Sequence, residues 1–404
     1  MLLPGLLIFA VVLSATFAMW EWPYQEWTRT SSQFVWQLAL VGPIAAAAAT
    51  FYAGRVTAPS RIFALRSARR PPWHVLARHL SLLAGSHLAG YLLALAPLVV
   101  VTVTKSQYGR ADFLVIATGL VALLCATVAG YLIGVWGRSA VLAPLSFVLL
   151  LGVSVAGTSG LTPLSPVPEK VLVLGQESSE PLLVFRLVLL VSLILLFVQL
   201  TITLLRSVSR VPPLQALTAL PFIVLLVVVA VLRPAPEVSS YQRNPPRECV
   251  ARSGTEYCVH AGHRGQLPAF VAAAEPVIQA YGSRPERARR VYDRALFGNL
   301  VPGHDMVIWP SLEPYNSVGA GVADVVASSL AGTNTCVIRH GFTPPQDVID
   351  FNGYFFTWLR NGGRPPSGDY NPFQNVPAPT VQRWIEAHET EIASCTIDLR
   401  GLPR

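Results

Sequence analysis

A pair of histidines, His260 and His263, closely follows Cys258 and is the nearest approach to a metal-binding motif in the chain. Imidazole and thiolate groups bind zinc, but zinc needs at least one further ligand here, and the other histidines are scattered. His388-Glu389 resembles the start of the helical zinc-protease motif, yet Ile392 stands where the second histidine belongs. We therefore expect no metal, and histidines that lie at the surface or at the start of helices.

Residues for other kinds of catalysis are equally sparse. Asp347 and Asp350 share one face of an expected helix, an arrangement that is typical of a solvated surface. No Gly-x-Ser-x-Gly elbow and no P-loop occurs, and the two lysines, Lys105 and Lys170, offer no P-loop lysine. The sequence predicts neither an enzyme nor a cofactor, so any ATP-driven role needs a separate ATP-hydrolysing subunit.

Four cysteines in the last part of the chain have a different chemistry. In an oxidising compartment an even number of cysteines predicts disulfides, here two of them with three possible connectivities. We favour Cys249–Cys258, across a hairpin that turns at Ser253-Gly254, together with Cys336–Cys395.

The elements that would position these residues divide the chain near Arg233. Hydrophobic residues make up 52% of the 404 residues and charged residues only 13%, against about 25% charged residues in a soluble domain. The region 233–404 holds 16 arginines and 16 acidic residues, so the net charge of +8 belongs to the first part. There the basic residues flank apolar stretches, which indicates a lipid bilayer and no nucleic acid as the partner.

About seven stretches in 1–232 are long and apolar enough to span a bilayer, which takes about 20 residues of helix. The first has no basic start and runs into Met19-Trp20-Glu21-Trp22, a poor cleavage site, so we expect a span rather than a signal peptide. Cys125, in the fourth stretch, should pack as a small apolar residue. The expected spans are 2–19, 34–53, 82–104, 113–136, 140–157, 182–205 and 214–232.

Basic residues in the loops between spans indicate the orientation. The even-numbered loops hold nine of them and no acidic residue, whereas the odd-numbered loops mix both signs. This bias predicts a multi-pass protein of the cell membrane with a cytoplasmic N-terminus, and seven crossings then place 233–404 outside the cytoplasm. Aromatic residues after the first span fit the outer interface; they are Trp20, Trp22, Tyr24 and Trp27. The nine basic residues are Arg55, Arg61, Arg66, Arg69, Arg70, Arg78, Arg138, Arg206 and Arg210.

Ionisable residues inside the expected spans are few. His87 is the only titratable group near the middle of a span, and we expect it to be packed or hydrogen-bonded. Arg186 lies near the start of the sixth span and is expected to reach the outer surface. Ion-coupled transporters usually place carboxylates or broken helices at mid-membrane, so the sequence disfavours secondary transport.

The region 233–404 is expected to be an extracytoplasmic α+β domain with disulfides. The helix at 345–360 should turn Ile349, Phe356 and Leu359 toward a core, and 361–378 reads as a loop. Short strands are expected at 248–252, 256–260 and 305–309, and helices at 266–281, 286–297, 317–330, 345–360 and 379–395.

The loop 54–80 is the strongest functional indication, because a short amphipathic helix is expected within it. Its arginines alone could hold the protein against anionic lipid. Alternatively, the helix docks a cytoplasmic partner. The residues expected to dock are Arg61, Phe63, Leu65, Arg66, Arg69 and Arg70.

This layout resembles the ABC-2 type permeases, which have six spans, a cytoplasmic N-terminus and an arginine-rich helix between spans two and three. The run Phe51-Tyr-Ala-Gly-Arg55, followed by Arg69-Arg-Pro-Pro-Trp73, is similar to a group of actinobacterial permease-like proteins with a seventh span and an extracytoplasmic domain. Cys258-Val259-His260 and Arg264 match the opening of that domain. The resemblance implies that 59–80 contacts an ATPase subunit, and that two membrane domains pair, for example as a homodimer.

The sequence thus predicts a membrane α-helical bundle with an outer α+β domain, acting as the permease-like subunit of an ABC-type exporter. The alternative is a membrane-anchored outer domain that binds a ligand or acts as a sensor without transport. Seven spans are more than an anchor needs, whereas the scarcity of polar residues in them favours the anchor.

Overall fold

The structure is a computed structural model of the chain, and its residues form two compact units, Met1–Ser240 and Tyr241–Arg404. Each unit is described by itself. The described residues are 2–22, 25–58, 72–156, 165, 167, 171–206, 239–282, 286–299, 307–312, 318–333, 336, 345–364, 371–397 and 402.

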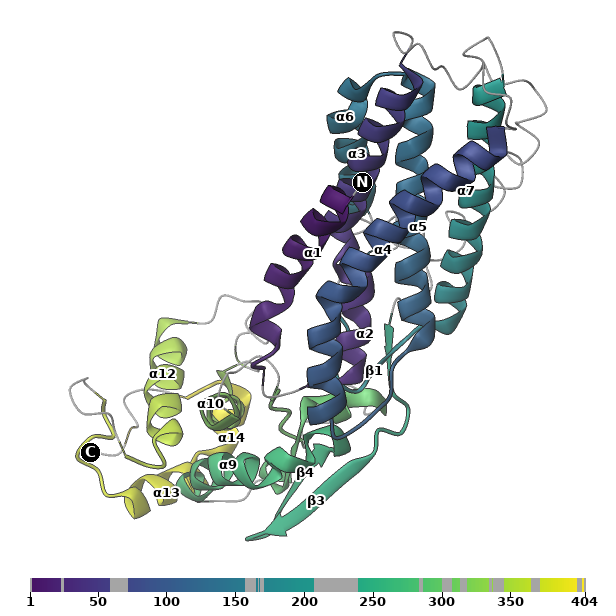
Figure 1. Cartoon of the computed structure of the whole chain (residues 1–404). Helices are drawn as coiled ribbons and strands as arrows, with labels where there is room; N and C mark the ends of the chain where they lie inside the picture. Colours follow the sequence, from purple (N-terminus) through teal and green to yellow (C-terminus); the bar gives the residue numbers. More distant parts are fainter. Residues whose placement is uncertain are drawn as a thin grey trace. The chain divides into compact units, whose positions relative to one another are not determined.

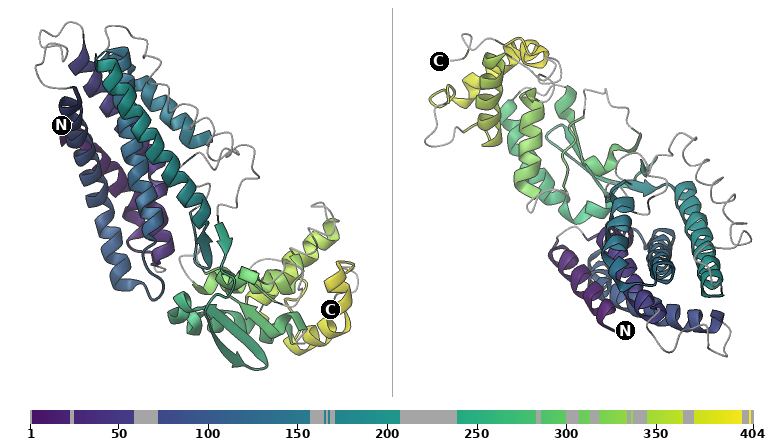
Figure 2. Two further views of the ribbon diagram at one scale, coloured as in Figure 1. Left: turned by 90° about the vertical axis from the view of Figure 1, so that its right-hand side faces the viewer. Right: turned by 90° about the horizontal axis from the view of Figure 1, so that it is seen from above.

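The first unit is a bundle whose long helices run along one another (Figures 1 and 2). A two-stranded sheet, β1 with β2, accompanies the helices. The elements are α1 (Leu2–Thr16), a 3-10 turn (Phe17–Met19), α2 (Trp27–Trp36), α3 (Leu38–Thr57), α4 (Pro72–Lys105), α5 (Phe113–Gly137), a second 3-10 turn (Ala140–Leu142), α6 (Ala143–Ala156), β1 (Gln176–Ser178), α7 (Glu180–Arg206) and β2 (Ser239–Tyr241).

Five helical segments of the described chain are long and apolar enough to cross a membrane. They confirm the expected helices at 2–19, 82–104, 113–136 and 182–205, because uninterrupted apolar runs leave helix as the only conformation that satisfies the backbone without water. The remaining segment, Trp27–Thr57, contains the expected span 34–53. The segments are Leu2–Met19, Trp27–Thr57, Trp73–Lys105, Phe113–Gly137 and Glu180–Leu205.

The second of these segments begins earlier than hydropathy predicts. Its first turns, in α2, are polar in sequence but buried in the bundle, because neighbouring helices supply hydrogen-bonding partners. Thr30 shares a 2.7 Å hydrogen bond with Thr102 of α4, and Ser31 accepts one of 3.0 Å from the amide of Asp112. A hydropathy average counts these residues as solvent-exposed and therefore misses the start of the helix.

The expected helix at 140–157 is present over its described residues, where a 3-10 turn, Ala140–Leu142, precedes α6. The 14 residues of α6 cover about 21 Å at 1.5 Å per residue, and residue 157 lies outside the described residues. The Ser139 hydroxyl caps the turn by accepting from the amide of Val141. Pro144 lies in the first turn of α6, where its missing amide proton costs no hydrogen bond.

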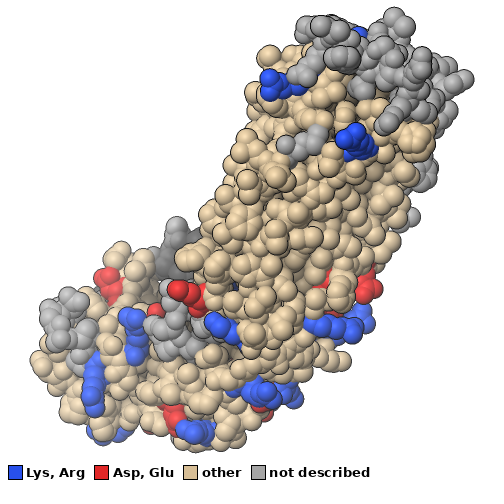
Figure 3. Space-filling model, viewed as in Figure 1, with Lys and Arg blue, Asp and Glu red and all other residues tan. Residues whose placement is uncertain are grey.

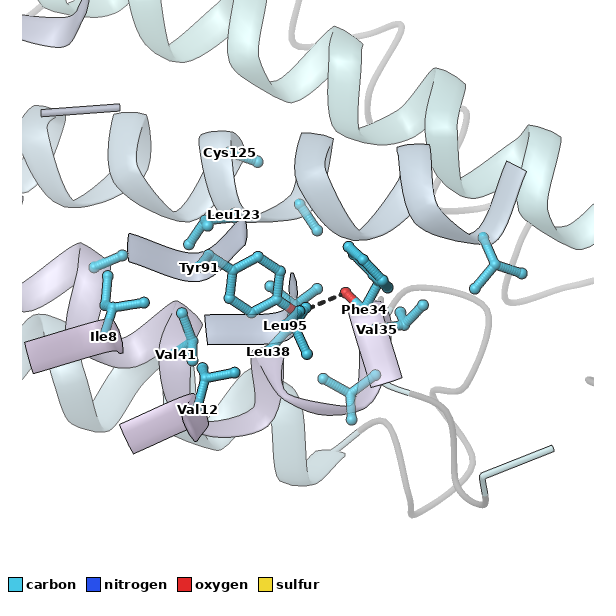
Figure 4. Packing of buried hydrophobic residues seen from close by; sticks show 14 of the residues in the cluster. Ile8, Val12, Phe34, Val35, Leu38, Val41, Tyr91, Leu95, Leu123 and Cys125 are labelled. Atoms are coloured by element: carbon cyan, nitrogen blue, oxygen red, sulfur yellow. Dashed lines mark hydrogen bonds between the residues drawn. The ribbon is translucent and has the colours of Figure 1, made fainter. Parts of the chain in front are cut away.

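The core of the bundle lies between α1, α3, α4 and α5 (Figure 4). Tyr91 is fully buried among aliphatic side chains, and its hydroxyl donates a 2.9 Å hydrogen bond to the carbonyl of Phe34. The two rings meet edge to face at 6.2 Å. This bond gives the Tyr91 hydroxyl, the one polar group of the side chain, a partner inside the apolar cluster. Other buried members are Ile8, Val12, Leu38, Val41, Leu95 and Leu123.

Glycines allow the helix backbones to approach closely, as is common in membrane bundles. A Cβ atom on Gly90 would lie 2.1 Å from the carbonyl oxygen of Gly5, so α1 and α4 touch backbone to backbone. A Cβ on Gly130 of α5 would meet the carbonyl oxygen of Ala46 at the same distance. These contacts fix the position of α4 against α1 and of α5 against α3.

The helices alternate in direction, so the charged residues of the bundle gather at its two ends. On the face seen in Figure 3, the part of the bundle between its two ends shows no Lys, Arg, Asp or Glu. Arg55, Arg78 and Arg138 share one end, which we call the arginine end, and the described part of that end holds no acidic residue. Asp112 lies at the opposite end, where its Oδ2 accepts a 2.9 Å hydrogen bond from Ser178.

The last described residue of α7 and the next described residue, Ser239, lie at opposite ends of the bundle. This helix begins beside β1 and ends at the arginine end, where Leu204 packs with Leu76 and Tyr131. The next described residue, Ser239, belongs to β2, which pairs with β1. A seventh crossing would give this arrangement, but the expected span 214–232 lies outside the described residues.

The second unit combines a three-stranded sheet with helices. Strand order is β3-β4-β5, with β3 and β4 antiparallel around the tight turn at Ser253-Gly254 and β5 parallel to β4. Both residues of the turn have positive φ, as a two-residue hairpin of this kind requires. The elements are β3 (Arg247–Arg252), β4 (Thr255–His260), a 3-10 helix (Ala261–Gln266), α9 (Leu267–Tyr281), β5 (Arg290–Tyr292), α10 (Val318–Leu330), α12 (Gln346–Arg360), α13 (Ala378–Ala387) and α14 (Glu389–Ser394).

Most expected elements of this unit are present, and three differ. The helix predicted at 286–297 is wrong: strand β5 lies between two 3-10 segments, because Val291 pairs with Tyr257 of the neighbouring strand. The helix predicted at 379–395 is interrupted at His388. At the expected strand 305–309, the described part contributes one bridge, Ile308 to Val291.

The buried face of α12 is also shifted from the expected one. Ile349 is 45% exposed and Phe356 only partly buried, whereas Leu359 is fully buried as predicted. The helix instead buries a denser apolar and aromatic stripe at helical spacing, and Trp358 and Phe355 pack within it. The residues of the buried stripe are Val348, Phe351, Asn352, Phe355, Trp358 and Leu359.

Candidate functional site

The expected docking residues Arg61, Phe63, Leu65, Arg66, Arg69 and Arg70 lie outside the described residues. The two helices that flank them are described: α3 ends at Thr57, and α4 begins at Pro72. What the structure shows is therefore how this segment is attached to the bundle.

The attachment is an aromatic cluster at the arginine end that joins three helices. His79 of α4 shares a 2.9 Å hydrogen bond between its Nδ1 and the hydroxyl of Tyr131 on α5. Tyr52 of α3 meets the His79 ring edge to face at 5.3 Å. Leu76, one turn before His79, is buried in the same cluster. The first turns of α4 are thus held to α3 and α5 by side chains that hydropathy alone does not identify.

Close backbone packing strengthens the same end. A Cβ atom on Gly54 would lie 2.4 Å from the carbonyl carbon of Ser139, and one on Gly134 would lie 2.5 Å from the carbonyl oxygen of Thr50. The Thr50 hydroxyl lies 2.8 Å from the carbonyl of Gly130 and 2.9 Å from the Ser146 hydroxyl. Helices α3, α5 and α6 therefore behave as one packed block beside the start of α4.

His87 lies in the interior of the bundle, fully buried, as expected of a packed and hydrogen-bonded residue. Its Nδ1 is 3.0 Å from the hydroxyl of Thr127, and that hydroxyl donates its proton to the carbonyl of Leu123 at 2.9 Å. His87 Nδ1 must then donate, which leaves Nε2 as an acceptor. Among the described residues Nε2 has no hydrogen-bond partner.

Arg186 departs from its prediction. Only 3% of the residue is exposed, so it does not reach the surface as a long cationic side chain near a helix end was expected to do. The side chain packs into the bundle because neighbouring elements cover this face of α7. Buried cations in a membrane helix are uncommon, which makes Arg186 a structural feature that the sequence position did not reveal.

Both expected disulfides are present in the second unit, Cys249–Cys258 and Cys336–Cys395, and Cys125 is a free, buried thiol in the bundle. Glu256 places a carboxylate oxygen within 4.8 Å of the Cys249 and Cys258 sulfurs. The sulfurs are bonded to each other, so neither is available to a metal as a thiolate.

The histidines that follow this disulfide form a buried polar cluster rather than a surface pair. His263 Nδ1 lies 2.5 Å from Asp293 Oδ2, and both residues are almost fully buried. His260 starts the 3-10 helix, as expected, and its Nδ1 accepts a 3.0 Å hydrogen bond from the amide of Gly262. Its Nε2 therefore carries the proton and donates to Gln242 Oε1 at 3.3 Å. Of the two expected locations, the start of a helix is confirmed for His260, whereas a location at the surface is wrong for both histidines.

The environment of His260 favours its neutral form. Burial lowers its pKa to about 4, while Asp293 raises the pKa and His263 lowers it. Asp293 follows β5 and lies 33 positions from His260 and 30 from His263, so nothing in the sequence groups it with the two histidines. The cluster ties the 3-10 helix to the end of β5.

The remaining candidate residues make local contacts or lie on an exposed helix face. His388 Nδ1 bonds the carbonyl of Trp384 at 2.9 Å and its ring stacks on that indole. Ile392, at the position a second zinc ligand would need, is buried. Asp347 is exposed and Asp350 accepts a 2.8 Å hydrogen bond from Gln346, as on a solvated face.

Comparison with protein-family models, with curated proteins and with solved structures finds no match to this chain.

Proposed function

We propose that the chain is a membrane-spanning, permease-like subunit of an ABC-type exporter, driven by a separate ATP-hydrolysing subunit that docks on the cytoplasmic segment 59–80. In this proposal the arginine end of the bundle faces the cytoplasm and the unit 241–404 lies outside it. The observation that carries the proposal is the attachment of α4 at the arginine end, through His79, to both neighbouring helices.

The length of α4 supports a coupling role. Its 34 residues extend about 51 Å, well beyond a hydrocarbon core of about 30 Å. The apolar span expected at 82–104 leaves the first ten residues, 72–81, as a helical extension of about 15 Å on the arginine side. A movement of segment 59–71 would be transmitted directly to this helical extension. The cluster at His79 would then pass it to α3 and α5.

Charge supports the same orientation. The described part of the arginine end holds Arg55, Arg78 and Arg138 and no acidic residue, whereas both signs occur at the opposite end. Cytoplasmic loops of membrane proteins carry this excess of basic residues. Two disulfides in the second unit fit an oxidising compartment.

The alternative, an anchored sensor or ligand-binding protein, is favoured by a separate observation. Several hydroxyls of the bundle bond carbonyls of their own helix, such as Thr118 to Leu114 and Thr201 to Phe197. Groups satisfied in this way do not line a polar path for a hydrophilic substrate. An exporter of this construction would therefore carry an apolar or amphipathic substrate.

Copurification from native membranes, followed by identification of bound proteins, distinguishes the two functions. The exporter proposal expects a stoichiometric ATPase subunit that is lost when segment 59–71 is replaced by a Gly/Ser segment of equal length. A chain that retains no ATPase, but binds a regulator or an extracellular ligand, would favour the sensor. A cytoplasm-specific reporter fused after Arg70 should be active and one fused after Arg404 silent.

A further inference from the structure

The two disulfides of the second unit differ in their access to solvent. Cys336 and Cys395 are 1% and 3% exposed, so both sulfurs of that bridge are enclosed. In the other bridge Cys258 is fully buried, whereas Cys249 is exposed. One bridge therefore joins a buried cysteine to an exposed one, whereas the other joins two buried cysteines.

The fold explains this asymmetry. Among the described strands β3 pairs with β4 alone and is an edge strand, and Cys249 lies on it directly opposite Cys258. Cys258 is on the central strand and is covered by Tyr292 and Leu296, with Trp309 packed against the same cluster. An attacking thiolate approaches in line with the bond that breaks. Attack at Cys249, the exposed residue of the pair, makes Cys258 Sγ the leaving group, whereas attack at Cys258 is hindered by the residues that cover it.

Charges on this face of the sheet bear on the same reaction. Strand register places Arg247, two residues before Cys249, and Arg290, paired with Glu256, on the face that carries the disulfide. Both arginines are exposed, and a nearby guanidinium favours thiolate over thiol. The Glu256 carboxylate opposes this effect, although it accepts a 2.5 Å hydrogen bond from the Tyr292 hydroxyl.

We propose that Cys249–Cys258 is a redox-active disulfide that takes two electrons from a dithiol by exchange at Cys249 Sγ, and that Cys336–Cys395 is structural. One thiolate of the dithiol bonds Cys249 Sγ, the Cys249–Cys258 bond breaks, and Cys258 leaves as a thiolate that takes up a proton. The second thiol of the dithiol then attacks its own mixed-disulfide sulfur and releases Cys249. The dithiol is oxidised to a disulfide and the protein is reduced to two thiols. This chemistry does not depend on transport.

The first test compares the two bridges in one molecule. The folded full-length protein is incubated with increasing dithiothreitol, alkylated with N-ethylmaleimide, and digested for mass spectrometry. We expect Cys249 and Cys258 to be alkylated at least ten-fold faster than Cys336 and Cys395. Equal rates, or earlier opening of Cys336–Cys395, would overturn the proposal.

The second test separates the two sulfurs of the exposed bridge. In Cys258→Ser the remaining thiol is Cys249, and in Cys249→Ser it is Cys258, with the wild type as the blank for Cys125. We expect the Cys249 thiol to form a mixed disulfide with 5,5′-dithiobis(2-nitrobenzoate) at least ten-fold faster than the Cys258 thiol. An intact Cys336–Cys395 bridge and a cooperative unfolding transition above the assay temperature show that each variant is folded. Similar reactivity of the two thiols in folded variants would refute attack at Cys249.

Discussion

His79 and Tyr131 join α4 to α5 through a 2.9 Å hydrogen bond between imidazole Nδ1 and the phenol hydroxyl. The two residues are 52 positions apart in sequence, and the bond lies next to the beginning of α4, where the proposed docking segment enters the bundle. It is therefore placed to transmit movement of that segment, in addition to stabilising the fold.

A pair of Tyr→Phe variants separates these two roles. Tyr131→Phe and Tyr91→Phe each remove one hydroxyl hydrogen bond inside the bundle, so each should reduce the free energy of unfolding by about 1 kcal/mol. Only Tyr131 lies at the arginine end, so only Tyr131→Phe should lower ATP hydrolysis by the assembled complex. An equal loss of ATPase activity in both variants would assign the effect to general destabilisation.

Glycine contacts predict a position-dependent effect on stability. Gly90→Ala would place a Cβ atom 2.1 Å from the carbonyl oxygen of Gly5, whereas a Cβ on Gly85 of the same helix meets nothing within 4 Å. We expect Gly90→Ala to destabilise the bundle by about 1–3 kcal/mol, as overpacking does. Gly85→Ala should be neutral or stabilising by up to about 1 kcal/mol. Thermal unfolding in detergent measures both, and equal unfolding temperatures would contradict the packing of α1 on α4.

The buried imidazole of His260 predicts a loss of stability in mild acid. Its folded-state pKa of about 4 lies below the ordinary value of 6.5, so the unfolded state binds the proton first as pH falls. The stabilisation is complete above pH 6.5 and is lost between pH 6.5 and 4, by at most about 3 kcal/mol.

Hydrogen exchange of segment 255–266 in the full-length protein measures this loss. His260→Asn is the control, because an asparagine oxygen can accept from the Gly262 amide but does not titrate. We expect protection to fall more steeply between pH 7 and 4.5 in the wild type than in His260→Asn. Parallel curves would show that groups other than His260 govern the acid response.

The two disulfides should contribute differently to stability. They close loops with sequence separations of 9 and 59 residues. Loop entropy then predicts a loss of about 3 kcal/mol for Cys249→Ala with Cys258→Ala, and about 4 kcal/mol for Cys336→Ala with Cys395→Ala. Urea unfolding of the second unit, followed by the fluorescence of its tryptophans, tests the order. The opposite order would show that packing around the short bridge outweighs chain entropy.

Sequence reasoning succeeded where one local pattern decides the outcome. Long apolar runs predicted the helices at 82–104 and 113–136, because no other conformation satisfies so long a backbone without water. Two short expected strands around a Ser253-Gly254 turn predicted the β3–β4 hairpin, and the hairpin places Cys249 opposite Cys258. The disulfide followed from the strand register.

Burial could not be predicted from the sequence where residues distant in the chain form the surroundings of a side chain. Thr30 and Ser31 lie before the expected span 34–53, and their partners on α4 and at Asp112 are distant in sequence. His260 and His263 were expected at the surface or at the start of a helix, and their burial beside Asp293, which follows β5, was not predicted. Which side chains are buried depends on the surface that packs against them. That surface is known only once the fold is known.

The most direct test of the proposed function is the amount of ATPase subunit that copurifies per mole of chain. Phe63→Ala and Leu65→Ala remove apolar anchors, and we expect each to weaken binding about ten-fold. Arg69→Lys combined with Arg70→Lys keeps the charge but loses the guanidinium fork, and should also weaken binding. Arg110→Lys, an exposed residue at the opposite end of the bundle, is the matched control and should bind normally. Unchanged ATPase content in all the docking variants, at normal expression, would contradict docking on segment 59–80 and leave the arginines as a lipid anchor.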